Sequence, residues 1–295
     1  MTLKKERLQE LADNIFFVEG EGRGIPPHSN SLLISNEKQV LIDTGLGMRL
    51  LRELRSDIDL VINTHCHVDH IRGNHLFKEV WACEIEADAI RSIETFKGLF
   101  GMRGHPLEEE LVKRLKEYGY HPSRVDKEFC GGDVLEFRET RWEVILTPGH
   151  SPGHCCFYEE EVKIVFSGDI DPSAFGPWYG WPKCNIDDFI ASIKRLMGMD
   201  IEVLVSSHLP PISDGITLAL GDYLEKIYNR ETKILGFLDK ERALKQIVDQ
   251  AFIYGVKMGR DVIRRLFEEN MVRLHLEKLI REGRVEAFSD GYRAV

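Results

Sequence analysis

Short apolar runs rich in β-branched side chains recur along the first two thirds of the chain. Four of them lie at residues 58–63, 142–146, 162–166 and 201–205. Runs of this length, bounded by Gly, Pro, Asn or Ser, are typical of β-strands. Each run leads at once into a short polar segment. The repetition predicts an α/β or β-sandwich scaffold that builds a site from loops at one edge of its sheets.

The remaining pattern adds more strands and several helices. The first strand is expected at 15–18, and others at 30–34, 40–42, 80–82 and 133–137. Apolar residues at helical spacing predict helices at 48–55, 84–96, 108–118 and 186–197. Strands and helices therefore alternate over about the first 220 residues.

The polar segment after the strand at 58–63 carries a dense group of metal-capable side chains. Residues 64–70 read Thr-His-Cys-His-Val-Asp-His, with His65, His67, Asp69 and His70 as candidate ligands. Without partners these groups would leave buried polar atoms unpaired, whereas a divalent cation satisfies them together. A lone histidine is usually structural, but this full pattern arises by chance in only about one chain in several thousand. The pattern predicts a metal site.

The three later strands each deliver one further candidate ligand. They end just before His150, Asp169 and His208. Cys66 lies between two candidates, but its side chain is expected to point away, because side chains alternate along an extended segment.

These blocks, in this order, resemble the metallo-β-lactamase superfamily, and the resemblance covers about residues 12–215. It implies an αββα sandwich with a one- or two-metal site. Carried over by position, the first metal would take His65, His67 and His150, the second would take Asp69, His70 and His208, and Asp169 would bridge them. Asp43, in the segment Val40 to Gly45, would support the site from outside the ligands.

The chain beyond the sandwich reads as a small second domain. We expect a catalytic domain over 1–220 and a helical domain over 221–295. Helices are expected at 218–237, 242–254, 261–267 and 271–281, and a β-hairpin at 283–295 around Asp290-Gly291. This order resembles a winged helix, as in the C-terminal domain of lactamase-β-like hydrolases. We expect it to serve assembly or substrate access rather than metal binding.

Composition narrows the setting. The chain has 295 residues, 43% hydrophobic and 30% charged, as in soluble globular proteins. A charged start without a following apolar segment, and no stretch near 18 apolar residues, predict a cytoplasmic protein without a membrane partner. The six cysteines show no Cys-x-x-Cys spacing and are expected to be mostly buried small hydrophobes.

Charge bears on the substrate. The formal net charge is −10; residues 221–295 hold 15 Lys/Arg and 13 Asp/Glu, so residues 1–220 hold 24 and 36, a net of −12. Such acidity disfavours RNA as a partner, because nucleic-acid binding depends on neutralising phosphates. A small-molecule substrate is therefore preferred, although bound metals would add local positive charge.

Three loop features are left open by the sequence. Four aromatic residues, Phe175, Trp178, Tyr179 and Trp181, follow Asp169 and can either line a substrate site or pin the loop to the core. Segment 97–120 can form a lid or a dimer surface, so a homodimer stays open. His28 lies in a Gly/Pro loop expected to overhang the site, and His154 is expected to act from outside the ligands.

The resemblance, which includes glyoxalase II, implies a metal-dependent hydrolase. A hydroxide bridging two divalent cations would attack a small ester, thioester or related acyl substrate, with Asp69 and Asp169 orienting it. The mixed His and carboxylate ligands favour zinc, with iron or manganese as alternatives. Two other functions stay open: a metal-dependent ribonuclease or phosphodiesterase, and a mononuclear iron oxygenase of the persulfide type.

Overall fold

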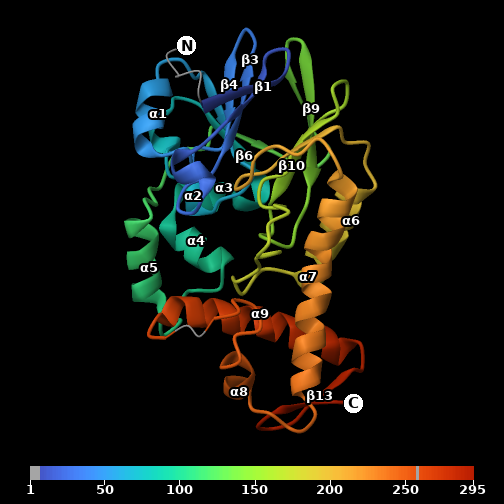
Figure 1. Cartoon of the computed structure of the whole chain (residues 1–295). Helices are drawn as coiled ribbons and strands as arrows, with labels where there is room; N and C mark the ends of the chain where they lie inside the picture. The colour runs from blue at the N-terminus through green and yellow to red at the C-terminus, as the bar shows by residue number, and fades with distance from the viewer. Residues whose placement is uncertain (1–6, 257–258) are drawn as a thin grey trace.

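A computed structural model describes residues 7–256 and 259–295. Two sheets pack face to face in the upper half of the molecule, and the C-terminal helix α9 crosses below them (Figure 1). The seven-stranded sheet contains β1 (Leu8–Ala12), β2 (Ile15–Val18), β3 (Ser31–Ser35), β4 (Gln39–Ile42), β5 (Leu60–Ile62), β6 (Val80–Cys83) and β7 (Lys127–Phe129) in that order. The five-stranded sheet has the order β12 (Val203–Val205), β11 (Ile164–Phe166), β10 (Cys155–Glu159), β9 (Thr140–Leu146) and β8 (Val134–Phe137).

Alternating side chains along the strands divide the core into layers. In β4, Val40 and Ile42 pack between the two sheets, while Leu41 faces outward onto helix α1 (Met48–Leu54). In β11, Ile164 and Phe166 enter the same central layer, and Val165 faces the opposite way. Because successive strand residues point to opposite faces, central strands such as β5 and β11 are buried on both sides, whereas the edge strand β8 leaves Val134 and Glu136 exposed.

The second sheet is covered by helices α6 (Ile186–Met197) and α7 (Ile216–Phe237). With α1 on the other outer face, the layers are helix, sheet, sheet and helix (Figure 1). The predicted αββα fold is confirmed. Helices α2 (Val68–Ile71), α3 (Glu84–Arg91), α4 (Ile93–Leu99) and α5 (Glu108–Glu117) follow the metal-site motif along the chain.

Several sequence-based boundaries were wrong, each for a local reason. The helix expected at 84–96 is two helices, because Ser92 is extended (φ −148°) and its hydroxyl accepts the Thr95 N–H at the start of α4. The helix expected at 242–254 is limited to α8 (Leu244–Val248), and Ala251 has a positive φ of 55°. Strands β1, β7 and β10 were not predicted.

The C-terminal region is helical and ends in a hairpin. The two helices expected at 261–267 and 271–281 form one continuous helix, α9 (Val262–Arg281). The hairpin is present as β13 (Val285–Ala287) paired antiparallel with β14 (Tyr292–Ala294). A winged-helix identity for this region stays a prediction.

The proposed domain boundary at 220/221 also stays a prediction. Helix α7 runs through it from Ile216 to Phe237. One apolar cluster contains Phe189 of α6 together with Leu276 and Leu279 of α9. Between residues 7 and 256 and from 259 to 295, no helix is both long and apolar enough to cross a membrane.

Candidate metal centre

The structure brings all seven predicted ligands together in two adjoining groups. The first contains His65, His67, His150 and Asp169, and the second contains Asp69, His70 and His208. His65 and His67 lie in the loop after β5, and Asp69 and His70 are on α2. The others follow β9, β11 and β12. Strand ends therefore deliver the side chains as the sequence indicated.

Asp169 connects the two groups. Its Oδ2 lies 3.1 Å from His150 Nε2 in the first group. Its Oδ1 lies 3.0 Å from His70 Nε2 and 3.2 Å from His208 Nε2 in the second. One carboxylate thus presents one oxygen to each group, which is the arrangement of a bridging ligand.

Hydrogen bonds on the outer sides of three imidazoles fix their tautomers. His150 Nδ1 lies 2.9 Å from the Trp178 carbonyl oxygen, and His208 Nδ1 lies 2.6 Å from that of Gly24. A carbonyl can only accept, so each Nδ1 carries a proton and Nε2 is the nitrogen that faces the other predicted ligands. His70 Nδ1, 2.7 Å from Asp43 Oδ2, is oriented in the same way. Such outer partners commonly orient metal-binding histidines.

The inner nitrogens have no complete hydrogen-bond arrangement of their own. His67 Nδ1 is 2.9 Å from His65 Nε2 and 2.8 Å from His150 Nε2, yet a single N–H can satisfy only one of them well. Within the described part of the chain, three buried atoms make no hydrogen bond of good geometry: His67 Nε2, and the pair His70 Nε2 and Asp169 Oδ1, which lie 3.0 Å apart. A cation would satisfy this donor set, so the residues fit divalent metal binding.

The pKa values of the imidazoles separate the two groups. Burial, and then the neighbouring imidazoles, lower the pKa of His65 and His67 well below the usual range, which keeps these rings neutral. Burial also opposes a charge on His208, but Asp169 and Asp69 outweigh it and raise its pKa to about 9. The carboxylates that attract a proton there would attract a metal cation in the same way, because metal binding displaces protons.

Asp43 lies where the resemblance implied, outside the ligands. It is fully buried and has a positive φ of 66°. Its carboxylate accepts hydrogen bonds from the Thr64 N–H (2.9 Å) and the Thr64 hydroxyl (2.7 Å) as well as from His70. It therefore fixes the start of the motif and one predicted ligand at once.

His154 and Cys66 lie outside both groups. His154 Nε2 accepts the backbone N–H of Asp169 (3.1 Å), and its Nδ1 lies 2.8 Å from the Thr147 hydroxyl. Burial lowers the pKa of His154 to about 3, so the ring is neutral and can accept that bond. Burial raises the pKa of the Cys66 thiol well above its usual range.

Glu86 was missed by the sequence-based prediction. It is 1% exposed and lies on α3, where one carboxylate oxygen accepts the Cys66 N–H (2.7 Å) and the other accepts the Gly153 N–H (2.8 Å). It therefore ties the loop of His65 and His67 to the loop of His150. Its position three and four residues before Ala89 and Ile90, on the apolar face of the helix, was the available signal.

The four aromatic residues after Asp169 divide between two roles. Tyr179 and Trp181 are buried and pin the loop to the core. The Trp178 ring is half-buried, with its centroid 5.9 Å from that of His67 and 5.7 Å from that of His150. Phe175 is 38% exposed. Only Trp178 combines partial exposure with a ring contact to the predicted ligands.

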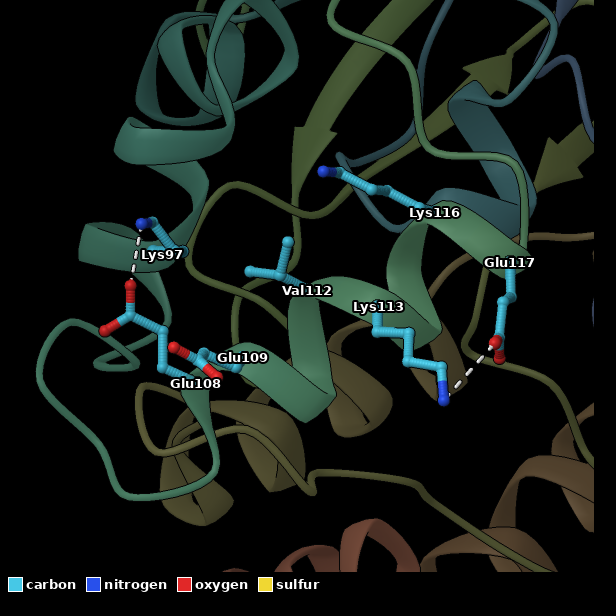
Figure 2. Close-up of a pocket in the computed structure, with 7 residues that line it drawn as sticks. All are labelled: Lys97, Glu108, Glu109, Val112, Lys113, Lys116 and Glu117. Carbon is cyan, nitrogen blue, oxygen red and sulfur yellow. Dashed lines mark hydrogen bonds and ion pairs between the residues drawn. The ribbon is translucent and has the colours of Figure 1, made fainter.

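A separate hollow lies along α5, within the segment 97–120. It has a volume of about 530 Å³ and contains none of the seven predicted ligands (Figure 2). Charged side chains line it in pairs: Lys97 Nζ is 2.7 Å from Glu108 Oε1, and Lys113 Nζ is 4.0 Å from Glu117 Oε1. His28 belongs to neither group of predicted ligands, and its Nε2 lies 3.7 Å from a carboxylate oxygen of Glu21.

Comparisons with known proteins agree with this geometry. Residues 24–208 match the model of the metallo-beta-lactamase superfamily. The chain is 27% identical over 226 residues to the acyl-coenzyme A thioesterase MBLAC2 of Homo sapiens, covering 68% of this chain and 79% of that protein. It is 27% identical over 187 residues to the hydroxyacylglutathione hydrolase GloC of Haemophilus influenzae, covering 59% and 82%.

A solved structure extends the similarity over the whole chain. The metallo-beta-lactamase family protein TTHA1429 from Thermus thermophilus matches with a TM-score of 0.76 at 25% identity, covering 97% of this chain and 100% of that one. The matched fold therefore includes the C-terminal helices. Together with the family match and the convergent His and Asp side chains, it shows that the chain belongs to the metallo-beta-lactamase superfamily and is a hydrolase of that superfamily.

Proposed function

We propose that the chain hydrolyses small acyl thioesters at a centre of two divalent cations, for which zinc is the favoured metal. The observation that carries the proposal is the position of Asp169, with one carboxylate oxygen facing each group of ligands. The substrate class is inferred from two relatives: MBLAC2 is an acyl-coenzyme A thioesterase, and GloC is a hydroxyacylglutathione hydrolase.

The first group would hold one cation through His65, His67 and His150, and the second would hold the other through Asp69, His70 and His208, with Asp169 shared. Bound cations of this kind supply a water that is ionised near neutral pH and polarise the acyl carbonyl. Asp69 is the most open of the seven, with its side chain 21% exposed. Asp69 would orient an incoming water, and Asp169 would keep the two groups of ligands at a fixed distance from each other.

Aromatic side chains shape the approach to the ligands. The half-buried Trp178 ring beside His67 and His150 offers an apolar wall for an acyl chain. Tyr179 and Trp181 are buried, so the loop offers no row of open rings on which nucleobases could stack. This supports a compact substrate over RNA, in agreement with the net charge of −12 in residues 1–220.

The test combines metal analysis with a substrate panel. Protein purified without added metal should contain two zinc ions per chain; a single iron would favour the oxygenase alternative. The panel compares acyl-coenzyme A, acylated glutathione, an ester, a β-lactam and a phosphodiester. The thioesters should be hydrolysed fastest, and the two thiol carriers distinguish between the activities named for the relatives.

The opposite pattern would overturn the proposal. Preferred cleavage of single-stranded RNA, weakening steeply as salt is raised, would assign the chain to the nucleases. An Asp169→Asn variant serves as the control for contaminating hydrolases, because it should lose thioesterase activity in the same preparation.

A further inference from the structure

The C-terminal helices α7 and α9 hold several backbone carbonyls of the loop that carries Trp178. Arg230 of α7 donates to the carbonyls of Phe175 (2.7 Å) and Pro177 (2.5 Å). Asn270 of α9 donates to the carbonyl of Gly180 (2.8 Å). Between these anchored carbonyls lies the carbonyl of Trp178, which accepts a hydrogen bond from His150.

Arg230 is the central contact of this arrangement. It is 4% exposed, and besides the two carbonyls it donates to the Tyr179 hydroxyl (3.0 Å). Its guanidinium lies over the rings of Phe175 (5.0 Å) and Tyr179 (5.5 Å). A planar guanidinium with five fixed N–H donors can hold several carbonyls in one geometry, which a lysine cannot.

Two further contacts fix the loop from the same side. The Tyr179 hydroxyl, which accepts from Arg230, is also hydrogen-bonded to His275 Nε2 of α9, 2.7 Å away. The Trp178 indole N–H donates to the Tyr254 hydroxyl (3.0 Å). The peptide between Pro177 and Tyr179 is therefore held on both flanks, and its carbonyl direction is set by residues beyond 220.

A second predicted ligand has a similar contact. The Tyr223 hydroxyl of α7 donates to the backbone carbonyl of Asp169 (3.1 Å), and Tyr223 is 3% exposed. Helix α7 thus contacts the backbone of Asp169 directly. Through Arg230 it also holds the carbonyls of Phe175 and Pro177, close to the Trp178 carbonyl that accepts from His150.

We infer that Arg230 is a positioning residue for the metal centre: by fixing the peptide that orients His150, it makes the C-terminal helices part of the metal-binding apparatus. This role differs from the sequence-based expectation of assembly or substrate access alone. It rests on the proposed metal binding. The loop also lies close to α7 at Gly176. A Cβ at that position (φ 85°) would lie 2.6 Å from Cβ of Lys226 in α7, so the position requires glycine.

The test compares Arg230→Met with Arg242→Met in the full chain. Arg242 is a matched control: it also donates to a carbonyl, that of Phe237, and lies over an aromatic ring at 4.5 Å, but it does not contact the loop. Zinc affinity is measured by competition with a chromophoric chelator, and the absorption spectrum of the cobalt-loaded protein reports ligand geometry.

Loss of an outer partner typically weakens metal binding by about 10–100-fold. We expect a loss of that size for one of the two cations in Arg230→Met, a changed cobalt spectrum, and a smaller loss in Arg230→Lys. Arg242→Met should bind both cations within about twofold of the original chain, because it leaves every contact to the metal-site loops in place. Tyr179→Phe, which removes only a hydroxyl, should show the same direction if Arg230→Met fails to fold.

Equal metal affinities and unchanged spectra in Arg230→Met and Tyr179→Phe would overturn the inference, as would an equal loss in Arg242→Met. Failure of the proposed function would look different. The unmodified chain would then bind its cations, and lose affinity for one of them in Arg230→Met, without hydrolysing thioesters in preference to the other substrates.

Discussion

The two groups of predicted ligands differ in how far they are open to solvent. His65, His67 and His150 of the first group are between 2% and 6% exposed. In the second group, the side chains of Asp69 and His208 are 21% and 14% exposed, although His70 is fully buried. If each group holds one cation, as proposed, the first is enclosed and the second meets solvent and substrate through Asp69 and His208.

Each group also has its own buried carboxylate outside the ligands. Glu86 joins the two loops of the enclosed group, through the Cys66 and Gly153 N–H groups. Asp43 holds His70 of the open group. The support for the two groups of ligands is thus separable, and the following variants test how independent the two proposed cations are.

The largest effect is expected at the residue that the two groups share. Asp169→Asn keeps the shape but removes the charge, so both cations should be lost or strongly weakened. A loss of several kcal/mol of transition-state stabilisation corresponds to roughly 10³-fold or more in kcat. Metal content by mass spectrometry and kcat on a thioester check this. A variant that keeps both metals would show that the groups do not depend on a bridge.

His208→Ala should lose only the open cation. His208 contributes to the second group alone, apart from its contact with Asp169. The purified His208→Ala variant should therefore retain one zinc per chain, bound by the first group. His150→Ala should instead retain the zinc bound by the second group. Cobalt spectra of the two singly loaded variants should differ. If both variants lose all metal, the two sites are too strongly coupled for the comparison to hold.

Asp43→Asn should weaken the open cation by about 10–100-fold, as expected for loss of a partner that orients a histidine ligand. An amide can present its NH₂ group to His70 Nδ1 and so favour the wrong tautomer. Chelator titration should show one weakened site and one unchanged site. Weakening of both sites equally would mean that Asp43 acts through the whole motif, by way of Thr64.

Glu86→Gln should have the smallest effect, and on the enclosed cation. One amide oxygen can still accept from Cys66 or Gly153, but the NH₂ group then faces the other N–H. A buried donor left unpaired costs about 1–3 kcal/mol of folding free energy. We expect a lower midpoint in urea unfolding and a several-fold weaker enclosed site, with the open site unchanged. Glu84→Gln, at an exposed position on the same helix, is the control.

Four of the predicted ligands could be placed from the sequence because each follows a strand. His65, His150, Asp169 and His208 are marked by their own residue types, and the apolar runs before them fix their place at the sheet edge. Their partners could not be found in this way. The carbonyl that accepts from His208 belongs to Gly24, 184 positions away, and a backbone carbonyl has no residue signature.

The bounds of α8 and α9 were predicted wrongly where a buried carboxylate of α9 contacts the backbone before it. Glu268 of α9 is 0% exposed and accepts the backbone N–H groups of Ile253 and Tyr254. On the sequence it interrupts the apolar periodicity, so α9 was divided into two helices. The same contacts hold residues 253 and 254 outside a helix, which shortened α8. Tertiary hydrogen bonds overrode the local pattern in both places.

The outward hydrogen bonds of the histidines have a consequence for folding. By turning Nε2 of His150 and of His208 toward the Asp169 carboxylate, the protein gathers side chains that a proton and a metal cation would compete for. Cation binding would therefore release protons and weaken as the pH falls. A bound cation would also stabilise the folded chain, by about 2.7 kcal/mol at a hundred times its dissociation constant.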